Sequence, residues 1–61
     1  MAGTAAIWLE PVYNDVKEQW EYVVVKTKNT LHVLVGEQLE KATVQDLIYG
    51  SYEVTIAPSK G

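Results

Sequence analysis

Hydrophobic and polar residues follow two different periods along this chain, and each period predicts different elements. Residues 5–9 form a short apolar run that ends shortly before Pro11. A run of this length, followed by a residue without a backbone N–H, is typical of a first β-strand. Near the C-terminus, apolar and polar residues alternate strictly over residues 52–56. This alternation predicts a last strand with Tyr52, Val54 and Ile56 on its buried face.

Residues 11–20 are compatible with two structures. Apolar residues recur at every fourth position from Val12 to Trp20 and would form one stripe on a helix, in whose first turn a proline is well tolerated. We therefore predict a helix here. In the alternative interpretation, Asn14-Asp15 is a hairpin turn between a strand over residues 8–13 and a long strand that runs through Trp20.

The next two segments predict a β-hairpin. Residues 20–26 contain three consecutive valines, a β-branched residue type that favours strands. Residues 31–35 alternate other apolar residues with His32 and Leu34, and residues 28–30 between the two segments are turn-like. Both faces of this hairpin carry apolar side chains. A domain of this size covers one face with its helices, so we expect the second face or an edge to be available for a partner.

Another helix is predicted after Gly36. Thr43 is followed three residues later by Asp46, which resembles a helix-start signature with aspartate in place of the preferred glutamate. Gly50 can close this helix in left-handed geometry. The helix would have about two turns, and its apolar face would consist of Val44, Leu47 and Ile48.

The predicted order of elements is β, α, β, β, α, β. We expect an α+β fold in which a small antiparallel sheet of about four strands carries one or two short helices on one face. If residues 11–20 are a hairpin arm, the same chain becomes an SH3-like, partly closed β-barrel with one short helix. Residues 1–61 would form a single small domain with frayed tails at 1–4 and 58–61. Its core would include Val33, Leu47, Val54 and Ile56.

The composition is that of a folded domain. Of the 61 residues, 48% are apolar and none is cysteine, so we expect a reducing, cytoplasmic location. No apolar run approaches the roughly 20 residues of a membrane helix, and we expect no membrane contact. The net charge is −3, and all five basic residues are lysines. Arginine is the usual residue for bidentate phosphate contacts, so this composition disfavours nucleic acid as a partner.

The sequence contains few residues suited to catalysis or metal binding. His32 is the only histidine, and the chain has no cysteine, no arginine and no Gly-rich phosphate loop. A lone histidine on a strand is most often a surface residue. Glu37, Glu40 and Asp46 are close in sequence, but this segment lacks the alternating ligands and central glycine of a calcium loop. We therefore expect no enzymatic activity, no cofactor and no metal site.

The aromatic residues indicate a binding surface instead. All six are tryptophan or tyrosine, so each carries a polar group that needs a partner or water. Such residues are enriched where protein surfaces meet, although several of them would contribute to the core of so small a domain. As candidate partner-binding residues we select Trp8, Trp20, Tyr22, Tyr49 and Tyr52.

These features predict a non-enzymatic protein–protein interaction module, an acidic binding or inhibitor-type domain, with a homodimer as one form. An acidic face would steer it toward a basic partner, and the residues of that face would be Glu10, Asp15, Glu18 and Glu21. One alternative is a single-stranded nucleic-acid-binding domain that stacks bases on aromatic residues. Its phosphate contacts would be Lys17, Lys26, Lys28 and Lys41. Another alternative is a structural subunit of a larger assembly.

Overall fold

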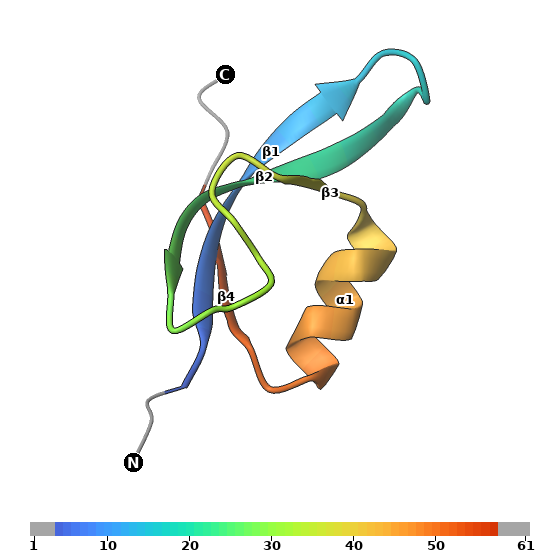
Figure 1. The fold of residues 1–61 in the computed structure, drawn as a ribbon. Helices are drawn as coiled ribbons and strands as arrows, with labels where there is room; N and C mark the ends of the chain where they lie inside the picture. The colour runs from blue at the N-terminus through green and yellow to red at the C-terminus, as the bar shows by residue number, and fades with distance from the viewer. Residues whose placement is uncertain (1–3, 58–61) are drawn as a thin grey trace.

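The chain forms one four-stranded sheet and one helix in the computed structural model, which describes residues 4–57 (Figure 1). The strands are β1 (Ala6–Asn14), β2 (Gln19–Lys28), β3 (Gln38–Leu39) and β4 (Glu53–Ile56), and the helix is α1 (Lys41–Tyr49). Their order across the sheet is β3-β2-β1-β4. The predicted α+β fold is confirmed, and the alternative of a partly closed barrel is wrong because the sheet stays open. Of the predicted tails, residues 1–3 and 58–61 lie outside the described range.

The sheet is mixed rather than antiparallel throughout, which corrects the prediction. β2 runs antiparallel to both β1 and β3, but β4 runs parallel to β1. The reason is the connection that precedes β4. After β3 the chain passes through α1 along one side of the sheet and enters the far edge beside β1 in the same direction (Figure 1). Parallel neighbours need such a crossover, which is usually helical.

Residues 11–20 belong to a hairpin, so the predicted helix is wrong and the alternative hairpin is correct. β1 and β2 pair over their whole length, and residues 15–18 form the turn between them. The Asn14 side-chain oxygen accepts hydrogen bonds from the backbone N–H groups of Val16 (3.0 Å) and Lys17 (3.1 Å). Asparagine commonly offers the backbone this local alternative to helical hydrogen bonds.

Pro11 lies inside β1 and does not end it, so the first strand is longer than the predicted residues 5–9. The Leu9 carbonyl accepts a hydrogen bond from the Ala57 N–H (2.8 Å), which shows that every second residue of β1 turns its backbone groups toward β4. Pro11 faces the same way, but β4 pairs with β1 only as far as Leu9. The missing N–H of Pro11 therefore removes no hydrogen bond from the sheet, and the strand continues.

The predicted second hairpin, over residues 20–26 and 31–35, is wrong in its second strand. The chain leaves β2 at Asn29, whose backbone is left-handed (φ 59°), and residues 30–37 form a loop. β3 is the segment that then pairs with β2. His32 accordingly lies exposed in this loop and not on a strand.

Local hydrogen bonds explain why this loop does not become a strand. Val24 of β2 donates its N–H to the Glu37 carbonyl and accepts a hydrogen bond from the Gly36 N–H (both 2.8 Å). Gly36 has φ 98°, a conformation that suits glycine. Within the loop, the Thr30 hydroxyl donates to the Val33 carbonyl (2.8 Å), and Val33 enters the core. Residues 31–35 lie in this loop and therefore do not pair with a described strand, although their apolar residues alternate.

The helix α1 begins at Lys41, earlier than the predicted start at Thr43. Glu40 precedes it with an extended backbone (φ −80°, ψ 159°), but the Glu40 side chain makes no capping hydrogen bond. Its carboxylate pairs with Lys17 in the hairpin turn instead. The Glu40 side chain is therefore used in a contact between distant parts of the chain and does not cap the helix.

The end of α1 is closed by Ser51 and not by a left-handed Gly50. Gly50 has φ −82°, whereas Ser51 has φ 72°. The Ser51 N–H donates to the Ile48 carbonyl (3.1 Å), and the Tyr52 N–H donates to the Leu47 carbonyl (3.0 Å). This pair of hydrogen bonds is a Schellman motif, in which the left-handed position is usually a glycine.

The core lies between the sheet and a layer formed by α1 and the loop of residues 30–37. Its buried residues are Ile7, Leu9, Val24, Val33 and Val44. Packed against them and partly buried are Tyr22, Leu39, Leu47, Tyr52 and Val54. Three of the predicted core residues are therefore found in or against the core. The fourth, Ile56, is 46% exposed because it lies on the edge strand.

The replacement Ile7→Val tests this core. Ile7 is fully buried, so the loss of one methylene group should lower the free energy of unfolding by about 0.5–1.5 kcal/mol. The matched control Ile48→Val removes the same group from a side chain that is 51% exposed, and it should change stability by less than about 0.5 kcal/mol. Urea unfolding followed by circular dichroism measures both effects. Equal effects of the two replacements would contradict the assigned core.

The replacement Ser51→Gly should stabilise the domain. A side chain with a Cβ atom is disfavoured by roughly 1–2 kcal/mol in left-handed geometry, so its removal relieves this cost. Part of the relief is offset because glycine has greater freedom in the unfolded chain. We expect a net gain of about 0.5–1 kcal/mol in urea unfolding. The control Ser51→Ala keeps the Cβ atom and should give no gain. A loss of stability in Ser51→Gly would show that the serine side chain, and not the backbone geometry, stabilises this end of the helix.

Candidate functional site

β1 and β2 extend beyond the helix-covered part of the sheet as a hairpin arm, which we define as residues 12–21. β4 pairs with β1 only from Ala6 to Leu9, and β3 pairs with β2 only at Tyr22 and Val23. Figure 1 shows the arm projecting past α1 and β4. A two-stranded ribbon is marginally stable in water by itself, so side-chain contacts must hold the arm in place.

Three large apolar side chains are exposed on the arm, and we call them the arm patch: Tyr13 (47% exposed), Val16 (93%) and Trp20 (59%). Tyr13 and Trp20 lie opposite each other on β1 and β2. Their rings meet edge to face, with centroids 5.4 Å apart and an interplanar angle of 71°. This arrangement is favourable for aromatic rings. It restrains both rings while leaving much of each ring open to solvent.

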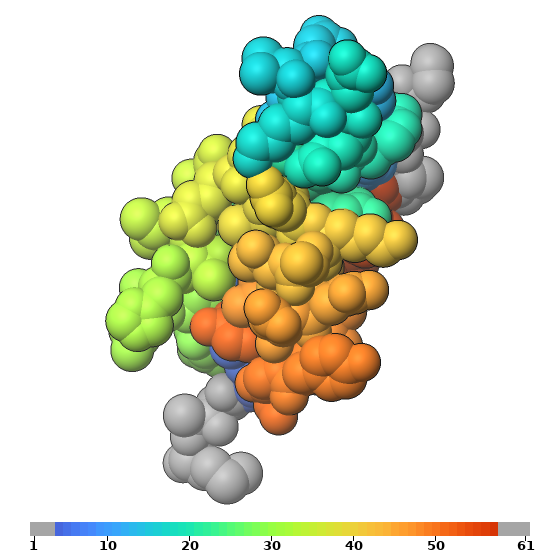
Figure 2. Space-filling model, turned by 90° about the vertical axis from the view of Figure 1, so that its right-hand side faces the viewer, coloured from blue at the N-terminus to red at the C-terminus, as the bar shows by residue number. Residues whose placement is uncertain are grey.

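A pocket of about 400 Å³ lies beside the arm patch, where the arm meets the start of α1. Its lining residues are Gln19, Trp20, Glu40, Lys41 and Ala42. Figure 2 shows this junction from the side of α1, with the arm standing above the helix. A volume of this size lies at the lower end of the range for ligand pockets and accommodates an amino-acid side chain. Trp20 therefore contributes both to the exposed patch and to the pocket.

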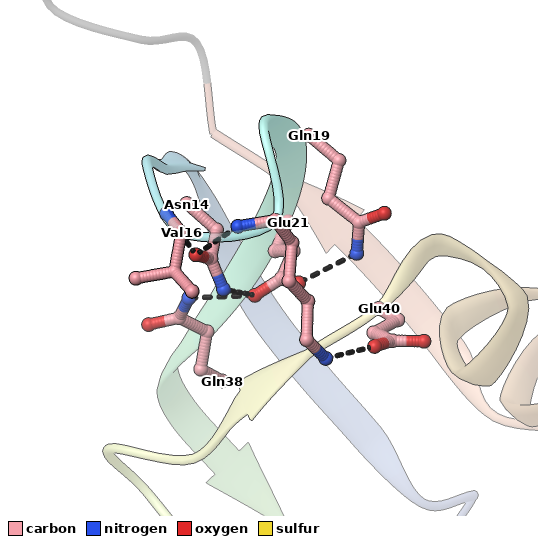
Figure 3. A network of polar contacts seen from close by, with 7 residues as sticks. Asn14, Val16, Gln19, Glu21, Gln38 and Glu40 are labelled. Atoms are coloured by element: carbon pink, nitrogen blue, oxygen red, sulfur yellow. Dashed lines mark hydrogen bonds and ion pairs between the residues drawn. The ribbon is translucent and has the colours of Figure 1, made fainter.

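A buried carboxylate connects the arm to the rest of the sheet. Glu21 of β2 is only 3% exposed. Its Oε1 atom accepts hydrogen bonds from Asn14 Nδ2 (3.1 Å) and Gln38 Nε2 (2.6 Å), and its Oε2 atom accepts one from Gln19 Nε2 (2.7 Å), as Figure 3 shows. These donors come from β1, β3 and β2. We call these residues the Glu21 cluster.

The cluster lowers the pKa of Glu21. The hydrogen bond from Gln38 is the largest cause, followed by those from Gln19 and Asn14, because each donor favours the charged carboxylate. Burial acts in the opposite direction, and Lys17 adds a small attraction. Because the pKa is lower in the folded than in the unfolded chain, the resulting stabilisation is complete above the ordinary value of 4.5. It is lost as the pH falls through the folded-state value.

An ion pair links the turn of the arm to the start of α1. Lys17 Nζ and Glu40 Oε2 are 2.5 Å apart, and this contact raises the pKa of Lys17. Both side chains are about half exposed, so the pair contributes little to stability. It does neutralise both charges. Asp15 and Glu18 remain as exposed carboxylates of the turn, and neither has an ion-pair partner among residues 4–57.

The two predicted tryptophan anchors lie in different parts of the fold. Trp20 lies on the arm, as described above. Trp8 is half-buried on the helix-free face of the sheet, because its neighbours Ile7 and Leu9 point into the core. The Lys26 ammonium group lies 4.7 Å from the centroid of the Trp8 ring and covers part of it.

The tyrosines also occupy different environments. Tyr22 and Tyr52 are half-buried against the core and act as core residues. Tyr49 is 88% exposed at the end of α1 that lies away from the arm (Figure 1). Sequence reasoning did not select Tyr13 for binding. The hairpin interpretation would have identified it, since a turn at residues 14–15 brings Tyr13 close to the second strand.

The predicted acidic face is not a continuous surface. Asp15 and Glu18 are exposed at the turn, whereas Glu10 is exposed on the helix-free face of β1. Glu21 requires a correction, because burial and three hydrogen bonds remove its carboxylate from the surface. Exposed negative charge on the arm is therefore concentrated at its tip.

Residues 4–57 offer few groups for a metal site or a membrane-spanning segment. Within residues 4–57, no three histidine, aspartate or glutamate side chains are grouped in a way that would hold a metal ion. The helix α1 has nine residues, and no helix in this range is long and apolar enough to cross a membrane.

Comparisons with known proteins found no relative: the chain matches no protein-family model, no curated protein and no solved structure. The functional argument therefore depends on the geometry of the arm and its surroundings.

The replacement Glu21→Gln tests the role of the buried carboxylate. An amide would stand where a charge accepts three hydrogen bonds, and its own N–H₂ group would face other donors, so the variant should be less stable than the wild type at pH 7. Its stability should also depend less on pH below 4.5, the ordinary pKa of the group. Thermal unfolding over a series of pH values measures both effects.

Glu10→Gln is the matched control for this experiment, because Glu10 is an exposed glutamate on the neighbouring strand. The control should keep the acid sensitivity of the wild type. If Glu21→Gln lost stability in acid just as the wild type does, the lowered pKa of Glu21 would not be the source of the pH dependence.

Proposed function

We propose that this protein is a non-enzymatic protein-binding module that contacts its partner through the hairpin arm. The observation that carries the proposal is the exposure of the Tyr13–Trp20 pair on a projecting part of the sheet. Tryptophan and tyrosine are enriched among the residues that dominate binding energy at interfaces. Rings that are already restrained, as in this edge-to-face pair, lose little conformational freedom on binding.

The contacts of the arm support this role because they hold it in one conformation. The Glu21 cluster joins β1, β2 and β3 and is the main contact that does so, and the half-exposed Lys17–Glu40 pair adds a weaker link from the turn to α1. A surface that is ordered before binding loses less entropy on association than a mobile one. Burying a charge is also seldom the most stable solution for a core. A buried carboxylate at the base of the arm is consistent with selection for the position of the arm.

The charges of the arm favour a basic partner. Asp15 and Glu18 are exposed close to the arm patch, and the whole chain has a net charge of −3. Complementary charge around an apolar contact accelerates association and disfavours acidic surfaces. The pocket beside Trp20 offers a concave site for one side chain of the partner. We therefore propose a basic protein segment with an apolar or aromatic anchor as the ligand.

The single-stranded nucleic-acid alternative has less support. Lys17 is paired with Glu40, Lys41 lines the pocket at the start of α1, and Lys26 covers part of Trp8 on the helix-free face. These lysines therefore do not follow one track along the sheet. A base would have to displace Lys26 before it could stack on the covered side of Trp8.

The replacement Trp20→Ala tests the proposed function. Peptides selected from a random library on the immobilised wild-type protein should be enriched in lysine and arginine. Their dissociation constants should rise about 30-fold or more in Trp20→Ala, which corresponds to about 2 kcal/mol for a central interface residue. Their affinity for the wild type should also fall as salt screens the charges. Fluorescence anisotropy of labelled peptides measures both effects.

Tyr49→Ala is the matched control, because Tyr49 is an exposed aromatic residue at the opposite end of α1 from the arm. This variant should leave the dissociation constants within about twofold of the wild type, as expected for a residue outside the contact. Selected peptides that are not basic, or that bind Trp20→Ala as tightly as the wild type, would contradict the proposal.

A further inference from the structure

The sheet has one edge that is suited to pairing with another strand. On one side, β3 is only two residues long. On the other side, the part of β1 that extends past β4 contains Pro11, which has no N–H to offer. Short strands and prolines are common features that prevent pairing at edges. β4 is the outermost strand, and its residues Glu53–Ile56 include neither proline nor lysine.

The outward backbone groups of β4 belong to Val54 and Ile56. Glu53 and Ala57 donate their N–H groups to carbonyls on the β1 side (2.9 and 2.8 Å), so alternate residues starting from Glu53 face β1. The N–H and carbonyl groups of the residues between them therefore point away from the sheet. Among residues 4–57, no strand lies on this outer side.

We propose that two copies of this chain pair antiparallel through β4 and form one continuous sheet with four strands from each copy. The pairing places Thr55 opposite Thr55 of the partner subunit. Val54 then exchanges both of its backbone hydrogen bonds with the partner's Ile56, and Ile56 does the same with the partner's Val54. Every outward N–H and carbonyl of these residues is used in both copies.

The side chains of β4 fit this self-pairing. Val54 and Ile56 lie on the core face, opposite Ile7 and Leu9 of β1, and Ile56 is 46% exposed in the single chain. In the pair, Ile56 lies beside the partner's Val54, which covers part of this exposed surface. Thr55 meets the partner's Thr55 on the other face, and threonine pairs across strands are favourable.

The charges of β4 are also compatible with a second copy of the chain. Glu53 is the charged residue of this strand, and antiparallel pairing centred on Thr55 places the two Glu53 carboxylates at opposite ends of the paired segment. No like charges meet. The chain's own β4 supplies apolar residues opposite Val54 and Ile56 and brings no like charges together, so a second copy is the occupant that we infer.

This interface is separate from the arm patch and does not depend on the function proposed above. The arm lies beyond Leu9, where the pairing of β4 with β1 ends. Both arms of the dimer therefore remain exposed. A partner with two binding segments could then engage both arms, which raises the overall affinity without any new contact.

Two replacements of Thr55 test the dimer. Thr55→Lys and Thr55→Glu each bring like charges together across the symmetry axis, at a position where side chains of paired strands are closest. Light scattering over a concentration series should show the wild type rising from 6.8 kDa toward twice this mass, while each variant alone keeps the monomer mass. An equimolar mixture of the two variants should regain the dimer, because opposite charges then meet.

Amide hydrogen exchange of the wild type provides a test that needs no variant. The N–H groups of Val54 and Ile56 should exchange more slowly as the protein concentration rises, whereas exchange at Tyr13 on the arm should not change. A wild-type mass that stays at 6.8 kDa up to about 1 mM would overturn the proposal, as would exchange at Val54 and Ile56 that does not depend on concentration. Folded variants whose mixture stays monomeric would also overturn it.

The result of these dimer tests does not depend on peptide binding through the arm. Peptides that depend on Trp20 should bind Thr55→Lys with the same dissociation constants as the wild type. Failure of the dimer and failure of the arm as a binding surface are therefore distinguished by separate measurements.

Discussion

The pairing of β1 with β2 is the interaction on which the rest of the structure depends. It runs from the helix-covered part of the sheet into the hairpin arm, with one register shift between Trp8 and Leu9. The three most deeply buried core residues, Ile7, Leu9 and Val24, come from these two strands. β3 bonds to β2, β4 bonds to β1, and the loop of residues 30–37 returns to Val24 through two backbone hydrogen bonds. The other elements are therefore arranged around this one pair of strands.

The two halves of the strand pair are stabilised by different physical means. Near the helix, apolar side chains are buried between the sheet and its covering layer, and this burial is not directional. On the arm there is no such layer, and the Glu21 cluster takes its place. A carboxylate that accepts three amide hydrogen bonds keeps its charge and is stable only when all of its donors are correctly placed. The cluster therefore specifies the geometry of the arm rather than merely its contact with the sheet.

The sequence was sufficient where one segment decides its own structure. The alternation over residues 52–56 predicted β4, and the apolar face of residues 44–48 predicted α1. Each segment needs only a core against which its apolar face can be buried, so its own pattern is enough to predict it. Residues 11–20 carry a helical stripe and a turn signal together. Contacts between Tyr13 and Trp20 and between Asn14 and Glu21 decide in favour of the hairpin, and they exist only once two strands have met.

The same limit applies to the candidate site. Trp20 was recognisable from its residue type, but the pocket beside it is formed with residues 40–42, which the chain brings there through β3. The sequence alone places Glu21 on the surface, because nothing in its neighbourhood distinguishes it from an exposed glutamate. One of its donors, Gln38, lies 17 residues away in sequence. Burial produced by distant partners leaves no local pattern in a single sequence.

Pro11 separates the two surfaces that we propose for binding. It lies just beyond Leu9, where the pairing between β1 and β4 ends, and its ring occupies the position of the N–H that would otherwise face outward there. A strand that adds to β4 lies one strand further from β1, so it bonds to β4 and not to the arm, and a strand that paired with β1 beyond Leu9 would meet Pro11, which has no N–H to offer. Self-pairing through the backbone is confined to the short edge of β4. The arm, which begins just after this proline, is left to engage a partner mainly through its side chains, foremost the Tyr13–Trp20 pair.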